Sequence, residues 1–258
     1  MLAVGPVTRA IEPLEMRVEN EVFVDQGTEP VARSLTLFRA GLAWDFLDGG
    51  RPGDAGEIIL HDPTRERVIV IDAARNVKTE IESLRLERLS ASLAAWARRS
   101  EDRLVRWAGG PDFDDGSRLQ DRSVELIGPR VRYEVAFAAA PSADAAEIYR
   151  RFADTALLLK TLLHPGGIPP FPRLALNRRI AAADGIPESV TLEIDSRAAL
   201  IGGRPNVLRS VHKLHPRLLG SDLQRIEDAE ARVAVAEPVD LATYVEASAA
   251  AHVTVSKE

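Results

Sequence analysis

The chain contains no cysteine. That absence excludes disulfide bonds, thiolate metal sites, iron–sulfur clusters and cysteine nucleophiles. Long hydrophobic runs are missing as well, since no stretch approaches the ~18 consecutive apolar residues that cross a bilayer. Residues 1–6 place no basic segment ahead of an apolar one, so they do not have the form of a signal peptide. We therefore expect a cytoplasmic protein without a transmembrane segment.

Motifs that bind nucleotides or activate a serine are also missing. The sequence has neither Gly-x-x-x-x-Gly-Lys-Ser/Thr nor a Gly-x-Gly-x-x-Gly after a strand, the two glycine-rich patterns that bind phosphates. It has no Gly-x-Ser-x-Gly elbow, in which a hydrolase would carry its nucleophile. The net charge of −6 argues against nucleic-acid binding, which relies on clustered cationic side chains. The sequence therefore indicates no cofactor and no nucleic-acid partner.

The composition that remains is typical of a globular protein, with 45% hydrophobic and 28% charged residues. Residues 14–24 alternate between apolar and charged side chains, which predicts a strand with one buried face. Residues 34–46 are apolar on either side of a break at residues 39–41, where a glycine favours a hairpin turn. A second hairpin is expected around Gly128.

Three short strand-like runs lie within residues 58–81. The two connectors between them both read Asp-x-x-Arg, beginning at Asp62 and Asp72, which is the rhythm of successive hairpins in a meander. Aspartate favours the first position of a turn because its carboxylate bonds to the backbone that follows. Residues 68–71 are apolar without alternation, so we expect the sheet to be covered on both faces there.

The meander at residues 58–81, its Asp-x-x-Arg turns and the helix expected directly after it resemble the curved half-barrel sheet of bacterial lipoprotein-carrier proteins. The resemblance covers residues 14–99 and rests on strand order and turn rhythm. It implies an antiparallel sheet that wraps around helices and leaves an apolar cleft for acyl chains. No functional residue carries over from it.

Two apolar stripes with spacings of three and four residues predict helices. One covers residues 86–96, with Trp96 expected in the core, and the other covers residues 145–163 behind a serine cap at Ser142. Together with the strands they predict a single α+β domain over residues 1–258. We expect a curved antiparallel sheet of about eight to ten strands, with the helices packed chiefly on one face.

Smaller features refine this prediction. Ser221, followed three residues later by Gln224, predicts a capping box at the start of another helix. Phe171 is the only large side chain in a proline-rich connector with few backbone donors, so we expect it to be a buried anchor. The N-terminal segment and residues 248–258 are expected to be loosely ordered.

The five histidines are the residues through which acid–base or metal chemistry would act. His212 and His215 point to opposite faces if they lie in a strand, so we expect surface or strand-end histidines and no metal site. His164 stands at the end of the long helix beside a glycine-rich loop. His164 and His212 are the candidate catalytic residues, provided that a distant carboxylate meets either ring. His61 precedes Asp62, which we assign to its turn.

The missing motifs, the absent cysteine and the few histidines favour a non-catalytic binding or interaction protein. Its cleft would take a small apolar molecule or a lipid. A protein partner, within a larger secretion or envelope assembly, is a further interpretation. The alternative from another class is a hydrolase or isomerase whose histidine–carboxylate site is assembled from distant segments.

Overall fold

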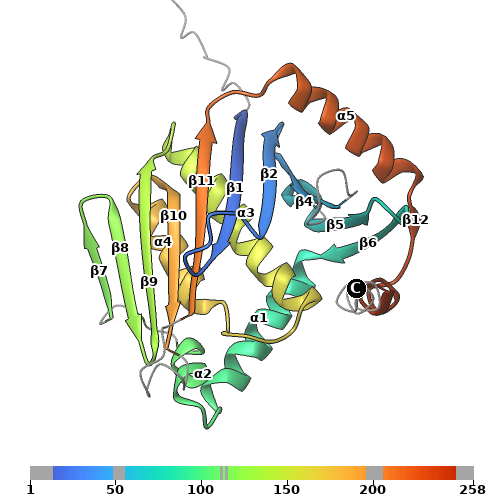
Figure 1. Ribbon diagram of the computed structural model, residues 1–258. Coiled ribbons are helices and arrows are strands. Elements are labelled where there is room, and N and C mark those ends of the chain that lie inside the picture. The colour runs from blue at the N-terminus through green and yellow to red at the C-terminus, as the bar shows by residue number, and fades with distance from the viewer. Residues whose placement is uncertain (1–13, 49–55, 111–112, 114–115, 196–205, 248–258) are drawn as a thin grey trace, which may run out of the picture.

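One sheet organises the computed structural model, which describes residues 14–48, 56–110, 113, 116–195 and 206–247 (Figure 1). Its strands are β1 (Met16–Val24), β2 (Ala32–Arg39), β3 (Leu42–Leu47), β4 (Glu57–Asp62), β5 (Arg67–Asp72), β6 (Val77–Glu82), β7 (Ser117–Gln120), β8 (Ser123–Gly128), β9 (Val131–Ala139), β10 (Gly185–Ile194), β11 (Asn206–His215) and β12 (Glu237–Pro238). From edge to edge they run β12-β6-β5-β4-β3-β2-β1-β11-β10-β9-β8-β7. Neighbours are antiparallel, apart from β12, which pairs with β6 in parallel. The predicted α+β fold with a curved antiparallel sheet is confirmed, with twelve strands among the described residues where eight to ten were expected.

Local sequence explains the hairpins of the first half. The β2–β3 turn places Ala40 and Gly41 at φ of 51° and 80°, the left-handed conformations of a tight two-residue hairpin. After β4, Asp62 accepts a hydrogen bond of 3.2 Å from the backbone N–H three residues on. Asp72 does the same after β5, at 2.9 Å. The turn role predicted for both Asp-x-x-Arg connectors is confirmed.

The first strand lies in the middle of the sheet. β1 pairs with β2 on one side and with β11 on the other, both antiparallel. The meander β1–β6 and the later strands β7–β11 therefore form one continuous sheet (Figure 1).

Helices cover both faces of this sheet. They are α1 (Ser83–Arg98), α2 (Arg103–Ala108), α3 (Ala143–Leu163), α4 (Phe171–Ala182), α5 (Gly220–Val235), a 3₁₀ turn η1 (Pro63–Arg65) and a last helix at residues 241–247. α1, α3 and α4 pack on one face, called here the α3 face, and α5 packs on the opposite α5 face. As predicted, Ser142 caps α3 by accepting a 3.1 Å hydrogen bond from the backbone N–H of Ala145. The helices thus lie chiefly on one face, and α5 is the exception.

β5 is apolar on both faces because both faces are covered. Val68 and Val70 belong to the buried cluster under α1 and α3. Ile69 and Ile71 belong to the cluster that α5 covers. None of the four is more than 3% exposed. The expectation that the sheet is covered on both sides here is confirmed.

Trp96 is not a core residue, and the prediction that it is was wrong. Its side chain is 58% exposed. α1 buries Leu86 in its first turns and Ala97 near its end, whereas the residues between them are half-buried or exposed. The reason is that α1 meets the sheet mainly at β6 and otherwise packs against α2 and α3.

α5 begins earlier than the sequence predicted. Its N-cap is Leu219, whose backbone N–H donates to Oδ2 of Asp222 at 2.8 Å. Asp222 is buried and also lies 3.6 Å from a guanidinium nitrogen of Arg17 in β1. A carboxylate is a stronger acceptor than a neutral amide. Asp222 therefore sets the start of the helix in place of the predicted pair of Ser221 and Gln224.

Phe171 is the first residue of α4 and does not lie within the preceding loop. Its ring packs against the buried cluster beneath α4, but it is only half-buried. The predicted anchor is therefore present in weaker form, because the helix start holds the ring nearer to solvent.

No helix in the described ranges is long and apolar enough to cross a membrane. The N-terminal residues 1–13 and residues 248–258, for which loose order was predicted, lie outside the part of the chain that the structure describes.

Candidate functional site

One row of side chains crosses the α3 face from β1 to β6. Residues that stand directly opposite one another in successive strands form it: Met16, Phe38, Ala43, His61, Val68 and Ile81. None of them is more than 5% exposed. His61 is the one polar member of the row, so the strand register places an imidazole in the middle of an apolar surface.

A cavity of about 120 Å³ lies between this row and α3, and we call it the His61 cavity. The β2–β3 turn, the end of β4, the start of β5 and one side of α3 line it. The buried residues Ala43 and His61 belong to its floor, whereas the exposed residues Gly41, Pro63 and Arg151 stand at its mouth. The cavity is therefore open to solvent on one side and apolar at its base.

The hydrogen-bonding capacity of the His61 ring is unused within the described residues. Its side chain is 5% exposed, and neither ring nitrogen has a partner among the described residues. Burial lowers the pKa of His61 to about 3, so the ring is neutral at physiological pH. Phe152 of α3 meets it edge-on, with ring centroids 4.8 Å apart. A neutral imidazole carries one donor and one acceptor, and leaving both unmade in the interior is unfavourable.

Asp62, next to His61 in the chain, has a structural role. Its side chain is 1% exposed and accepts hydrogen bonds from Thr64 at 2.6 Å and from Arg67 at 3.4 Å. Burial acts to raise the pKa of Asp62, but these bonds and the backbone N–H of Arg65 outweigh it and hold the pKa below its ordinary value. The carboxylate is thus charged and engaged in the turn at η1.

A second buried acid lies close to His61 on the same face. Asp45 of β3 is directly opposite Ile59, two residues before His61, so carboxylate and imidazole are diagonal neighbours on adjacent strands. Thr36 donates to Oδ1 of Asp45 at 2.8 Å. Burial raises the pKa of Asp45 to about 6, and the bond from Thr36 opposes this only in part. Asp45 and His61 form no hydrogen bond with each other.

His212 is not the surface or strand-end histidine that the sequence predicted. It lies in β11 beneath α3, with Nδ1 3.3 Å from the hydroxyl of Tyr149 and Nε2 3.1 Å from Oγ of Ser210. Burial lowers the pKa of His212 to about 3, and the cation of Arg173 adds to the effect. The prediction of opposite faces is confirmed, since His215 approaches a carboxylate on the α5 side of β1 at 3.9 Å.

The contacts among Ser210, His212 and Tyr149 have the outline of a nucleophile, a base and an orienting group. A base with a pKa near 3 takes up little of a serine proton at neutral pH, however. Both ring nitrogens are already engaged, so among the described residues no aspartate occupies the position that the sequence hypothesis required. The arrangement is better suited to holding α3 against β11 than to transferring protons.

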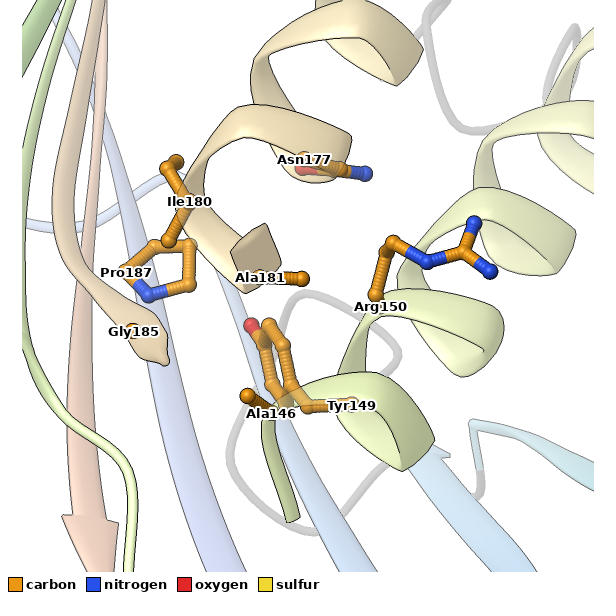
Figure 2. A pocket seen from close by; sticks show the side chains of 8 residues that line it. All are labelled: Ala146, Tyr149, Arg150, Asn177, Ile180, Ala181, Gly185 and Pro187. Carbon is orange, nitrogen blue, oxygen red and sulfur yellow. The ribbon is translucent and has the colours of Figure 1, made fainter. Parts of the chain in front are cut away.

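His164 is the C-cap of α3. Its backbone N–H donates to the carbonyl of Lys160 at 2.9 Å, and its side chain is exposed. It lines neither the His61 cavity nor the hollow shown in Figure 2. The structure therefore does not bring the two candidate catalytic residues, His164 and His212, into one site.

A smaller hollow lies between α3, α4 and the start of β10 (Figure 2). Its volume of about 10 Å³ accommodates roughly one water molecule. Asn177, 4% exposed, donates from Nδ2 to Asp154 at 2.8 Å, while its Oδ1 has no partner among the described residues. Figure 2 shows the amide nitrogen of Asn177 pointing toward α3. The hollow has room for about one water molecule and is too small for a ligand.

Within the described part of the chain, no three or more histidine, aspartate or glutamate side chains converge to hold an ion.

Sequence analysis did not select His61 as a functional residue, because Asp62 beside it already explains the turn. The available signal was its position, since it directly continues the apolar run at residues 58–60 of a strand covered on both faces.

No family model matches the chain, and no curated protein matches it in sequence. The His61 cavity and the groups around it are therefore the basis on which a function can be inferred.

Proposed function

We propose that this chain is a non-catalytic binding protein that holds a small, mainly apolar molecule in the His61 cavity. One observation carries the proposal: about 120 Å³ of space lies over an apolar row, with a partnerless histidine at its floor. Protein interiors contain few voids larger than a water molecule, and an empty one lowers stability. A ligand that fills this space gains apolar contacts and completes the hydrogen bonds of His61.

The cavity indicates the size and polarity of the ligand. An engineered apolar cavity of about 150 Å³ binds benzene, so the enclosed part of this ligand is about one aromatic ring. Phe38 and Phe152, edge-on with centroids 5.3 Å apart, favour a ring at that position. Neutral His61 offers one donor and one acceptor, which suits a hydroxyl group better than an anion. A phenol satisfies all of these conditions.

The resemblance to lipoprotein-carrier proteins supports an apolar ligand of a related kind. A carrier of that type encloses acyl chains between a curved antiparallel sheet and its helices. The His61 cavity, at about 120 Å³, is too small for a long acyl chain, so only the end of a lipid chain would be enclosed here and the rest would extend past Gly41 and Arg151 at the mouth. A short-chain alcohol therefore belongs among the test ligands.

The proposal is tested by ligand-observed NMR titration with phenol, toluene and 1-hexanol. Phenol is expected to bind saturably and roughly three- to tenfold more tightly than toluene, the effect of one net hydrogen bond. His61→Leu should erase this preference while toluene still binds, because only the ring nitrogens are lost. Ala43→Leu should abolish binding of all three, since its side chain fills the cavity.

His215→Leu is the matched control, because this histidine is half exposed and does not line the cavity. It should leave every affinity unchanged. The proposal fails if the native protein binds none of the three molecules saturably. It also fails if Ala43→Leu binds them as the native protein does.

A further inference from the structure

Arg173 is a cation without an anion. It is the third residue of α4, and its charge acts on the hydroxyls of Tyr133 and Tyr149 and on the ring of His212. Its Nη1 is buried and has no hydrogen-bond partner among the described residues. Within the same residues, no carboxylate forms an ion pair with its guanidinium.

Asp154, the carboxylate whose charge acts on Arg173, already has other hydrogen-bond partners. Asp154 of α3 accepts from Nη1 of Arg150 at 2.7 Å on one oxygen, and from Asn177 at 2.8 Å on the other. Arg150 is shared in turn with Glu147, through two further bonds of 2.7 Å. This chain of contacts balances Arg150 and leaves the charge of Arg173 unmatched.

A half-buried cation such as Arg173 is unfavourable without a counterion, because the hydration lost at its buried nitrogen is not replaced. The planar fork of a guanidinium matches the two oxygens of a carboxylate and binds them through parallel hydrogen bonds. Burial raises the pKa of both Tyr133 and Tyr149 to about 12, so both hydroxyls stay protonated. The hydroxyl of Tyr149 already bonds with His212, which leaves that of Tyr133 as the donor beside Arg173. The surroundings of Arg173 thus supply donors and a positive charge to an incoming anion.

An apolar row extends from this point across the α3 face. Tyr133, Leu192, Leu208 and Val24 stand directly opposite one another in β9, β10, β11 and β1. Tyr133 is 5% exposed, but Leu208 is 41% and Val24 is 43% exposed. Three strand spacings separate the two ends, which is roughly 14 Å. The row is therefore polar and buried at Tyr133, and apolar and open at Val24.

We propose that Arg173 binds the carboxylate of a small amphiphile whose hydrocarbon chain lies along Leu192, Leu208 and Val24. Charge complementarity selects this occupant. A neutral apolar molecule would leave Arg173 unmatched, and a polyanion would exceed its single charge. None of these four residues lines the His61 cavity, so the site is independent of the proposed function.

The test compares decanoate, 1-decanol and acetate by isothermal titration calorimetry on the full chain, at concentrations where decanoate is monomeric. Decanoate carries both the charge and the chain, 1-decanol only the chain, and acetate only the charge. Decanoate is expected to bind at least tenfold more tightly than either of the others.

Three variants assign the interaction to its residues. Arg173→Gln should weaken decanoate at least tenfold and leave 1-decanol unchanged. Leu208→Gln should weaken both, because this side chain is exposed enough for the fold to tolerate the change. Arg178→Gln, an exposed arginine of the same helix, is the control and should bind decanoate as the native protein does.

Thermal melts separate a lost site from a lost fold. Arg173→Gln should melt no lower than the native protein, because the substitution removes an unmatched, half-buried charge. The proposal is overturned if decanoate does not bind, if it binds no better than 1-decanol, or if Arg173→Gln retains its affinity. An equal loss in Arg178→Gln would also overturn it, since attraction would then depend on net charge alone.

Discussion

The indole ring of Trp107 fills the space that a side chain at position 128 would need. A Cβ placed on Gly128 would lie 2.5 Å from two atoms of that ring. Trp107 packs edge-on against Phe113 on another side, with ring centroids 5.3 Å apart. Glycine at the end of β8 therefore permits α2 to dock against the sheet.

Gly128→Ala should lower the free energy of unfolding by about 1–3 kcal/mol, because the added methyl group overpacks a site that cannot move freely. Gly220→Ala is the matched control, since a Cβ there meets open space, and it should change stability by less than about 0.5 kcal/mol. Urea unfolding followed by tryptophan fluorescence measures both. Equal stability of the two variants would contradict the packing described.

Asp45 should make the protein lose stability as the pH rises. Its pKa is about 6 in the folded state against an ordinary 3.8. Between these pH values the folded protein holds a proton that the unfolded chain has released, so the free energy of unfolding falls toward neutral pH. The full effect is on the order of 3 kcal/mol above pH 6.

Asp45→Asn keeps an acceptor for Thr36 and cannot ionise. It should match the native protein near pH 4 and be more stable than it at pH 7 to 8, as measured by urea unfolding at each pH. Asp228→Asn, an exposed change in α5, should show no such divergence. A native advantage at pH 8 would mean that the carboxylate of Asp45 is not penalised by burial.

The effect of His61 on stability should have the opposite sign, with stability lost as the pH falls. Its pKa is about 3 in the folded state against an ordinary 6.5. As the pH falls below 6.5 the unfolded chain takes up the proton first, so stability is lost on acidification toward pH 3. The loss at pH 5 is on the order of 2 kcal/mol. His61→Leu should lose less stability than the native protein between pH 7 and pH 5, as measured by urea unfolding at each pH.

Phe171→Ala should destabilise by about 1–3 kcal/mol, below the usual 3–5 kcal/mol for a fully buried phenylalanine, because the ring is half-buried. Differential scanning fluorimetry gives the change in melting temperature. An unchanged melting temperature together with loss of a bound partner in a pull-down would make Phe171 a recognition residue instead.

The strands and turns of the first half could be predicted because their signals are local. The signal in residues 14–24 is an alternation of apolar and charged side chains along one strand. The aspartates at 62 and 72 bond to backbone groups only three residues away. The exposure of Trp96 could not be predicted, since a stripe of apolar residues does not say how far along a helix the sheet extends. The strand β12 could not be predicted either, because its pairing with Val77 joins segments that are far apart in sequence.

The candidate sites depend on register, which the sequence alone does not provide. His61 becomes the floor of a cavity only when three strands place Ala43 and Val68 on either side of it. Arginine is frequent in this chain, so Arg173 carries no local signal. Its significance comes from Tyr133 and Tyr149, which two other elements bring within reach of its charge.

The two residues of β12 have a consequence for solubility. Strand β6 would otherwise end the sheet with free donors and acceptors, the template on which strands of other molecules assemble. The N–H of Glu237 donates to the carbonyl of Asn76 at 3.0 Å, and that of Val239 to Lys78 at 2.8 Å. A chain cut after Val235 should therefore form oligomers visible by light scattering even where its helices and remaining strands persist. We therefore expect the segment after α5 to keep neighbouring copies of the protein from adding to the β6 edge of this sheet in a concentrated solution.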